Sequence, residues 1–238
     1  MVGPVDNVTP KVAFSEHDLR RFHTHLHAVD TFANARDWLM YCLSFYGLLR
    51  VSEVHRLSWA DISIQSNTHV GITVPYSKTS LTPVVIRLTV REDWACPLLA
   101  YNRYITALNR ALSGTRLWPS RTWPLFINDP KQSLSSGITE QHSQSLLKSI
   151  ISRTLERDPT PYAWHSFRRG GCTAMLNARV PDSIVQSHGR WRSDCYIRYY
   201  DSKNIESLLP TQLLHLRDPT TSASSIPSGS TYPKSVSW

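Results

Sequence analysis

The sequence places charged side chains at helical spacing in two regions. Arg50 and Glu53 lie three positions apart, directly after the apolar run YGLL. Residues at this spacing share one helix face, and by themselves the two predict an ion pair on a helix surface. His165 and Arg168 repeat the spacing with an imidazole and a guanidinium. An imidazole can move a proton near neutral pH, and a guanidinium can bind a phosphate group.

The surroundings of His165 and Arg168 are typical of a packed helix. Phe167 falls on the inward face, and Gly170 and Gly171 permit another backbone to approach closely. The alternative is a capping histidine near a helix start, followed by a solvated arginine. The residue types alone leave both interpretations open.

A third region, residues 188–200, alternates basic and aromatic side chains in the run HGRWRSDCYIRYY. This composition suits phosphate binding by the arginines, with Trp191 packed beside them. Aromatic core positions separated by solvated arginines are the alternative interpretation.

The hydrophobic pattern predicts the elements that must position these residues. Apolar residues recur at helical spacing through most of the chain, and β-branched residues cluster in three short runs. Lys78 falls between the second and third runs, at the tip of a predicted hairpin. We therefore expect a mainly α fold with a small three-stranded antiparallel β-sheet. Helices are predicted from Ser15, over 38–49, 51–57, 98–108 and 144–155, and from His165 and Pro181, and strands over 62–64, 70–74 and 84–88.

The two ends of the chain differ from the middle. Residues 1–14 hold two Pro and one Gly without periodicity, which predicts a linker or arm. One domain is expected over residues 15–215. Ser, Thr, Pro and Gly dominate after about residue 218 and cannot bury enough surface to fold, so residues 216–238 are predicted to be a flexible tail.

Composition limits the possible partners. The 238 residues carry 26 Lys and Arg against 18 Asp and Glu, a net charge of +8 that favours a polyanionic partner. No run of 18 apolar residues could span a membrane, and the first residues lack the pattern of a secretory signal. The four cysteines form no CxxC or CxxH pair, so neither a disulfide framework nor a metal site is predicted. We expect a protein that is neither secreted nor bound to a membrane.

The order of the motifs resembles the catalytic domain of tyrosine recombinases, the family of phage integrases and Xer recombinases. The shared pattern runs from Arg50 through Lys78, His165 and Arg168 to the aromatic run, and it spans residues 14–209. Within the family, GRWRSDCYIRYY is most similar to recombinases of eukaryotic mobile elements of the Crypton, DIRS and Ngaro kinds. The resemblance implies the tyrosine recombinase catalytic-domain fold.

The resemblance also implies roles for individual residues. Arg50 and Arg168 would clamp the scissile phosphate and stabilise the charge that grows on it during attack. Lys78 would protonate the departing 5′ oxygen, and His165 would take the proton of the nucleophile. Trp191 resembles a position that holds His or Trp in the family, where an indole N–H can donate to a phosphate oxygen.

The implied nucleophile is a tyrosine near the end of the pattern. The RY ending of the mobile-element subgroup selects Tyr199, whereas counting nine residues on from Trp191 selects Tyr200. We favour Tyr199 and keep Tyr200 as the alternative. Tyr196 is expected to be a packing residue, and Glu53 is expected to support the site rather than react.

Basic residues beside the motifs are the expected DNA contacts: Arg169, Arg190, Arg192 and His188. His188 occupies a place where the subgroup usually has an aliphatic residue. It is therefore either a second phosphate contact or a surface substitution, and we favour the second interpretation.

The implied activity is cleavage and rejoining of double-stranded DNA through a 3′-phosphotyrosine, without metal or cofactor, for integration or excision of a mobile element. A tetramer on paired DNA sites is expected from the resemblance. The alternatives are relaxation of DNA like that by type IB topoisomerases, a DNA-binding module that has lost catalysis, and a protein-interaction scaffold. The enzyme would act in the nucleus of a eukaryote and otherwise in the cytoplasm.

Overall fold

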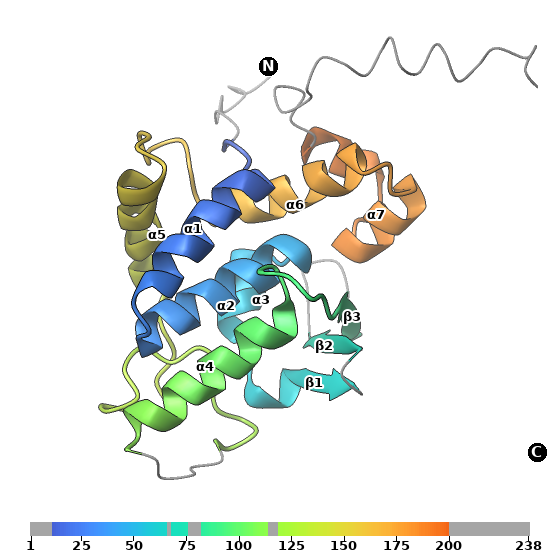
Figure 1. Ribbon diagram of the computed structural model, residues 1–238. Coiled ribbons are helices and arrows are strands. Elements are labelled where there is room, and N and C mark those ends of the chain that lie inside the picture. The colour runs from blue at the N-terminus through green and yellow to red at the C-terminus, as the bar shows by residue number, and fades with distance from the viewer. Residues whose placement is uncertain (1–10, 66–67, 76–81, 114–118, 200–238) are drawn as a thin grey trace, which may run out of the picture. The chain divides into compact units, whose positions relative to one another are not determined.

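A computed structural model describes residues 11–65, 68–75, 82–113 and 119–199 (Figure 1). These residues form a mainly helical fold with one three-stranded antiparallel sheet, which confirms the predicted fold class. Within this part of the chain, no helix has the length and apolar character needed to cross a bilayer. The predicted tail lies outside the described residues. The elements are α1 (Glu16–Ala28), α2 (Phe32–Tyr46), α3 (Val51–Arg56), the 3₁₀ helix η1 (Trp59–Asp61), β1 (Ile62–Gln65), β2 (His69–Val74), β3 (Val84–Thr89), α4 (Pro97–Ala111), α5 (Glu140–Thr154), α6 (His165–Asn177), α7 (Asp182–Gly189) and the 3₁₀ helix η2 (Asp194–Tyr199).

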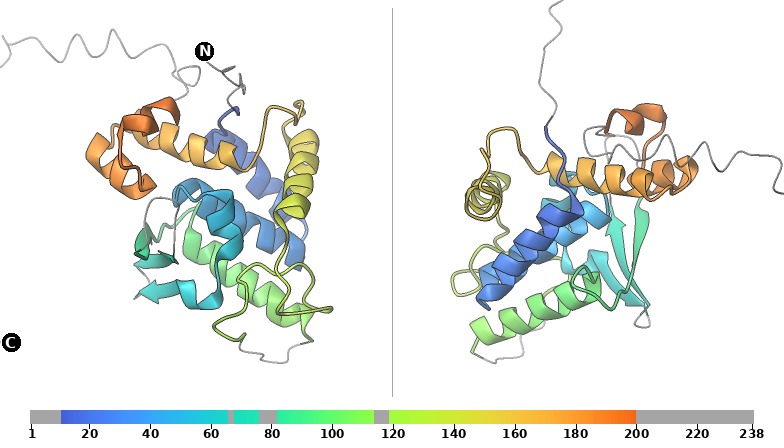
Figure 2. Two further views of the ribbon diagram at one scale, coloured as in Figure 1. Left: turned by 180° about the vertical axis from the view of Figure 1, so that it is seen from behind. Right: turned by 45° about the horizontal axis from the view of Figure 1, so that its top comes forward.

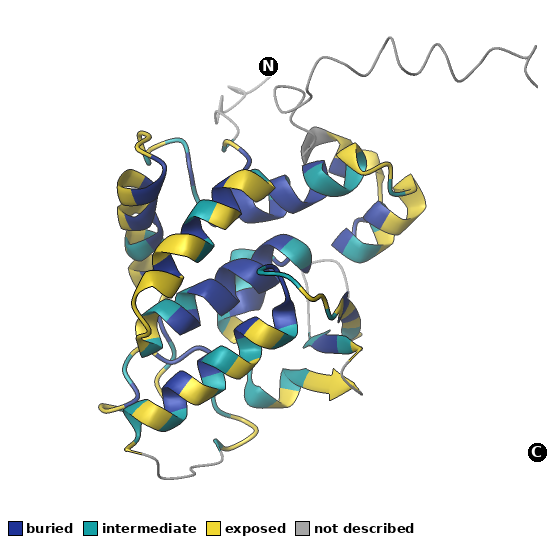
Figure 3. Cartoon of the chain, in the orientation of Figure 1, coloured by how far each residue is buried: buried dark blue, intermediate teal, exposed yellow. Residues whose placement is uncertain are grey.

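Helix α2 is the centre of the helical layer because apolar side chains lie on all its sides. Trp38, Leu39, Cys42 and Phe45 are all buried. Helices α1, α4 and α6 each pack against α2, and buried residues extend along most of its length (Figure 3). A helix that is apolar all round must be enclosed by other elements. The other helices are therefore positioned relative to α2.

The sheet lies at one side of the helical layer, with strand order β1-β2-β3 (Figure 2). Val70 pairs with Leu88 and Ile72 with Ile86 across β2 and β3, and all four side chains are buried. These cross-strand pairs put one apolar face toward the helices. The three strand predictions are confirmed, and each strand is one residue longer than predicted. Lys78, between β2 and β3, lies outside the described residues.

Two helices begin earlier than their hydrophobic pattern predicts. Helix α2 starts at Phe32 rather than at residue 38, and α5 starts at Glu140 rather than at residue 144. In both cases a threonine caps the first turn: the Thr31 side chain accepts from a backbone N–H over 3.1 Å, and the Thr139 side chain over 3.2 Å. The first turn of α5 is polar and exposed, so it adds little to the apolar periodicity, and in α2 the buried Arg36 interrupts the apolar pattern before Trp38.

The core begins inside residues 1–14, the segment that the sequence assigns to a linker or arm. Ala13 and Phe14 are both buried. The Phe14 ring stacks on Tyr162 with ring centroids 5.0 Å apart, and its backbone N–H donates to the Ser166 carbonyl over 3.1 Å. Both partners are about 150 positions away in the sequence, so local periodicity does not predict this packing.

Helix α6 approaches its neighbours so closely that two positions have no room for a side chain. A Cβ on Gly170 would lie 2.0 Å from the Phe14 carbonyl oxygen, and one on Gly171 would lie 2.1 Å from the Phe45 carbonyl oxygen. Backbone atoms cannot move aside without disturbing the fold. These contacts hold α6, which carries His165 and Arg168, against the end of α2.

We predict that Gly171→Ala destabilises the protein. Alanine gains about 1 kcal/mol in helix propensity, but the clash with the Phe45 backbone costs more, so we expect a net loss of about 2 kcal/mol. Urea unfolding followed by circular dichroism measures the change. Asn177→Ala, at an exposed position of the same helix, is the control and should leave the midpoint nearly unchanged. Equal midpoints for Gly171→Ala and the wild type would contradict the close packing.

Candidate active site

Arg168 is 0% exposed and binds two backbone carbonyls. Its Nη1 donates to the carbonyl of Leu48, at the corner after α2, and its Nη2 donates to the carbonyl of Gly189 over 2.6 Å. The ring of Trp191 covers the guanidinium, whose carbon lies 4.3 Å from the ring centroid. A buried charge needs such partners because it has lost its hydration. Arg168 therefore ties α6 to the ends of α2 and α7.

His165 lies one helical turn before Arg168, at the first residue of α6. The helix start is held by Gln144 of α5, whose side-chain oxygen accepts from the Trp164 backbone N–H over 3.2 Å. The imidazole is on the exposed side of the helix. Loss of hydration, and then the positive charges of Arg168 and two further arginines, lower the pKa of His165 below 6.5. The ring is therefore mostly uncharged at neutral pH and can accept a proton.

Arg50 and Glu53 differ from an ordinary surface ion pair. The Glu53 side chain is 4% exposed, whereas that of Arg50 is 29% exposed. The carboxylate accepts from the Arg50 backbone N–H over 2.8 Å and from its Nη1 over 2.7 Å. Burial alone would raise the pKa of Glu53, but the charges of Arg190 and Arg50 and the hydrogen bonds from Arg50 lower it below 4.5. A charged, buried carboxylate thus anchors a guanidinium that reaches the surface.

Arg190 turns inward rather than in the direction expected of a DNA contact, whereas Trp191 packs beside an arginine, as the composition of the run predicts. Instead of facing outward toward DNA, the Arg190 guanidinium lies inside the protein, and its Nη2 pairs with Glu53 over 2.7 Å. Trp191 is buried and lays its ring face on Arg168. The physical reason is the backbone: Arg190 has a φ of 59°, which ends α7 and turns the chain back toward α2.

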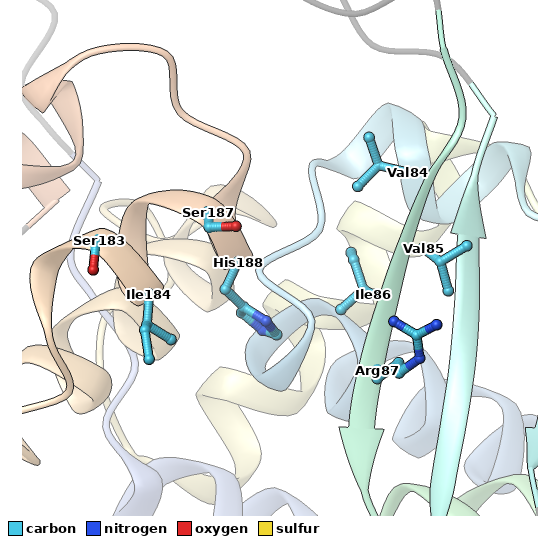
Figure 4. A pocket seen from close by; sticks show the side chains of 8 residues that line it. All are labelled: Val84, Val85, Ile86, Arg87, Ser183, Ile184, Ser187 and His188. Atoms are coloured by element: carbon cyan, nitrogen blue, oxygen red, sulfur yellow. The ribbon is translucent and has the colours of Figure 1, made fainter.

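The other predicted DNA contacts have varied surroundings. Arg192 is exposed and Arg169 is half-buried. His188 donates through Nε2 to the Tyr46 carbonyl over 2.7 Å, and burial lowers its pKa below 6.5. It lines a cavity of about 310 Å³ between α7 and β3, where Figure 4 shows its ring on the side of Ile86. His188 thus links α7 to the end of α2 in the described conformation.

The tyrosine-bearing segment is described up to the end of η2. Tyr199 is the last residue of η2, and Tyr200 lies outside the described residues. Tyr196 is buried in a small apolar cluster with Trp191 and Cys172, which confirms the prediction that it packs. This cluster attaches the segment that ends at the candidate nucleophile to α6 and α7.

The corner between α2 and α3 brings the candidate residues together. Arg168 and Arg190 both donate to the carbonyl of Leu48, and Glu53 joins Arg190 to Arg50. The Leu48 carbonyl was missed by the sequence analysis because a backbone acceptor carries no residue signature. Leu48 has a φ of 47°, a left-handed conformation that leucine rarely adopts. Among the described residues, no three His, Cys, Asp or Glu side chains gather closely enough to hold a metal ion.

We predict that Arg168→Leu lowers the free energy of unfolding by roughly 2–4 kcal/mol, because the Gly189 carbonyl loses its donor and the Leu48 carbonyl loses one of two. Urea unfolding measures this loss. Arg153→Leu removes an exposed arginine from α5 and should change stability by less than about 0.5 kcal/mol. A similar small change in both variants would show that the two carbonyls do not depend on Arg168.

The arrangement of elements is similar to that in solved recombinase structures. XerA recombinase superposes with a TM-score of 0.61 at 15% identity, covering 91% of this chain and 67% of that chain. XerH site-specific recombinase in a pre-cleavage complex with difH gives 0.58 at 16% identity, covering 82% and 52%. The Tn1549 transposon integrase with circular intermediate DNA gives 0.55 at 13% identity, covering 90% and 67%. No curated protein matches the sequence.

This chain spans about half the length of the XerH chains that it matches. The sequence model of the phage integrase family matches residues 13–206. That range begins beside the buried Phe14 and includes Arg50, Arg168, Arg190 and η2. The chain therefore belongs to the phage integrase family.

Proposed function

We propose that this protein cleaves and rejoins double-stranded DNA through a 3′-phosphotyrosine intermediate, as a site-specific tyrosine recombinase. The observation that carries the proposal is the meeting of two arginines at one corner. Arg168 binds the Leu48 carbonyl there, and Arg50, two residues after Leu48, is held by Glu53. Membership of the phage integrase family and the net charge of +8 support the proposal.

In the proposed reaction, a tyrosine oxygen attacks the phosphorus of a DNA phosphodiester. The phenolic proton passes to His165, a P–O bond to tyrosine forms, and the bond to the 5′ oxygen breaks. Lys78 protonates that leaving oxygen. Arg50 and Arg168 stabilise the extra negative charge on the non-bridging oxygens in the transition state. Attack by a 5′-hydroxyl on the phosphotyrosine reverses these steps and rejoins the strand.

Arg168 is enclosed in the described conformation, so its role requires a movement. The Trp191 ring covers its guanidinium, and two carbonyls occupy its nitrogens. DNA binding would have to displace the Trp191 ring before a phosphate oxygen could reach Arg168. Arg50 already reaches the surface and would contact the phosphate first.

Tyr199 is the proposed nucleophile, with Tyr200 as the alternative. Arg169 and Arg192 are proposed as contacts to DNA phosphates, because they flank the site without the internal ion pair that Arg190 makes. The XerH and Tn1549 integrase structures contain DNA, and a structure of the lambda integrase is a dimer on a core site. We propose double-stranded DNA as the partner and a homotetramer on paired sites as the active assembly.

For the biological role we propose integration or excision of a mobile element, of the Crypton, DIRS or Ngaro kind, in a eukaryotic nucleus. The run GRWRSDCYIRYY favours this subgroup. A DNA-binding module without catalysis is the second candidate, favoured by the enclosure of Arg168. Covalent attachment to DNA distinguishes the two candidates.

We predict a covalent protein–DNA adduct on nicked suicide duplexes, in which the cleaved end diffuses away and the intermediate accumulates. Duplexes recovered from a randomised library by binding to the protein supply the probe. Denaturing gels detect the adduct, and peptide mapping should find it on Tyr199. An adduct on Tyr200 would correct the nucleophile. Tight binding without any adduct would instead support the module that has lost catalysis.

We also predict how the rate of adduct formation depends on pH. His165 accepts a proton only when neutral, so lowering the pH through its pKa should slow the reaction, with a midpoint below 6.5. His165→Gln should lower the rate by about 10²- to 10⁴-fold and abolish this acid limb. His142→Gln, on the exposed face of α5, is the matched control. An acid limb that persists in His165→Gln would exclude His165 as the base.

A further inference from the structure

The turn after α7 is closely packed, and two neighbouring residues, Gly189 and Arg190, determine its path. A Cβ on Gly189 would lie 1.8 Å from the Trp191 ring, so a side chain there would displace the indole. Arg190 has a φ of 59°, and its backbone N–H donates to the Ser187 carbonyl over 3.0 Å. The left-handed residue ends the helix and points its own side chain toward the corner between α2 and α3.

The Arg190 guanidinium donates to one carboxylate and three backbone carbonyls. Nη2 pairs with Glu53 Oε2 over 2.7 Å and donates to the Leu48 carbonyl over 3.0 Å. Nη1 donates to the carbonyls of Gly47 over 3.3 Å and His188 over 3.0 Å. The side chain is 6% exposed. In this conformation Arg190 is part of the protein interior.

Glu53 is shared by two arginines, one on each carboxylate oxygen. Oε1 binds Nη1 of Arg50 over 2.7 Å, and Oε2 binds Nη2 of Arg190 over 2.7 Å. We name this Arg50–Glu53–Arg190 arrangement the double ion pair. Arg50 is the only member of the double ion pair that reaches the surface. The orientation of the Arg50 guanidinium depends on where Glu53 holds its Nη1.

Loss of Arg190 would disturb the exposed end of the double ion pair. Glu53 Oε2 would still accept the hydrogen bond from the Arg50 backbone N–H, but it would lose the ion pair with Arg190. The site is buried, so water would replace that partner poorly. The carboxylate would then turn toward any remaining donor, and the Arg50 guanidinium would turn with it. A group that must meet a phosphate within a fraction of an ångström is sensitive to such a change.

Resting on the proposed function, we propose that Arg190 is a positioning residue that fixes the Arg50 guanidinium through Glu53. The turn that carries Arg190 continues into η2, which ends at Tyr199. The double ion pair therefore couples the segment of the proposed nucleophile to the arginine that first meets the phosphate. Docking of that segment sets the geometry of Arg50.

The test compares Arg190→Gln and Arg190→Lys with the wild type in single-turnover adduct formation at saturating DNA. Lysine keeps the charge but cannot bind Glu53 and the backbone carbonyls together. We expect both variants to slow the reaction on the order of 10- to 100-fold. DNA affinity and its salt dependence should stay as in the wild type. Arg153→Gln, an exposed arginine of α5, is the matched control.

A substrate without charge at the scissile phosphate separates positioning from simple loss of structure. In a methylphosphonate duplex, a methyl group replaces one non-bridging oxygen, so the charge that Arg50 stabilises is reduced. If Arg190 acts through Arg50, the rate losses of Arg190→Gln and Arg50→Ala should both shrink on this duplex. On the natural phosphate, the double variant should be no slower than Arg50→Ala alone.

Other results would overturn the inference. Arg190 would be a direct DNA contact if two results were found together. DNA binding by Arg190→Gln would depend on salt less steeply than binding by the wild type, by about one phosphate contact, and the rate losses of Arg50→Ala and Arg190→Gln would multiply in the double variant. If the rate loss of Arg190→Gln were equally large on the methylphosphonate duplex, the role of Arg190 would be purely structural. Lower thermal unfolding midpoints in both Arg190 variants would then confirm a structural role. A wild-type rate in both variants would exclude any role.

Absence of adduct in the wild type would reject the proposed function but still leave the inference testable. Nitrogen NMR of the arginine side chains reports the order of the Arg50 Nε–H group directly. Arg190→Gln should increase the mobility of Arg50 and leave Arg153 unchanged. Unchanged order at Arg50 would show that Arg190 does not position it.

Discussion

The structure of the site depends on finding acceptors for a guanidinium that has no access to water. Arg168 is buried at the crossing of α6 with the end of α2, and an unpaired charge there would cost several kcal/mol. Its Nη1 and Nη2 donate to the carbonyls of Leu48 and Gly189. Carbonyls can point into this space only because the chain leaves both helices in unusual conformations, with positive φ at Leu48 and at Arg190. The need of the buried Arg168 guanidinium for carbonyl acceptors thus accounts for the strained turns at Leu48 and Arg190.

Charge balance explains the rest of the corner. Arg190 and Arg168 are both buried, and the Leu48 carbonyl accepts from each of them. The Glu53 carboxylate supplies the negative charge, which lowers the repulsion among the three arginines and leaves Arg50 partly exposed. The same corner therefore stabilises the fold and presents one guanidinium to the surface. One carboxylate thus holds both the partly exposed Arg50 and the buried guanidinium of Arg190.

The rigidity of this corner comes from α2 and from the close approach of α6. Gly170 and Gly171 let the α6 backbone contact the chain at Phe14 and Phe45 directly. Aromatic rings of Phe14, Phe167 and Tyr162 fill the space around that contact. Such packing resists small displacements, since interiors this dense have few voids to move into. The candidate residues of α6 are accordingly held by backbone contact, and those of the α7 turn by hydrogen bonds.

The fold class, the three strands and most helices could be predicted from the sequence, because apolar periodicity reflects which faces are buried. It also singled out Arg50, Glu53, His165 and Arg168 by their residue types and spacing, although Arg50 is the N-cap of α3 and not a helix residue. Tertiary structure alone decided that Arg190 turns inward to Glu53 and that Trp191 covers Arg168. The first arrangement rests on a backbone carbonyl, on a positive φ value and on partners more than 130 positions away, and the second on the turn that brings Trp191 back over α6. None of these leaves a periodic or compositional trace, so only the folded chain defines them.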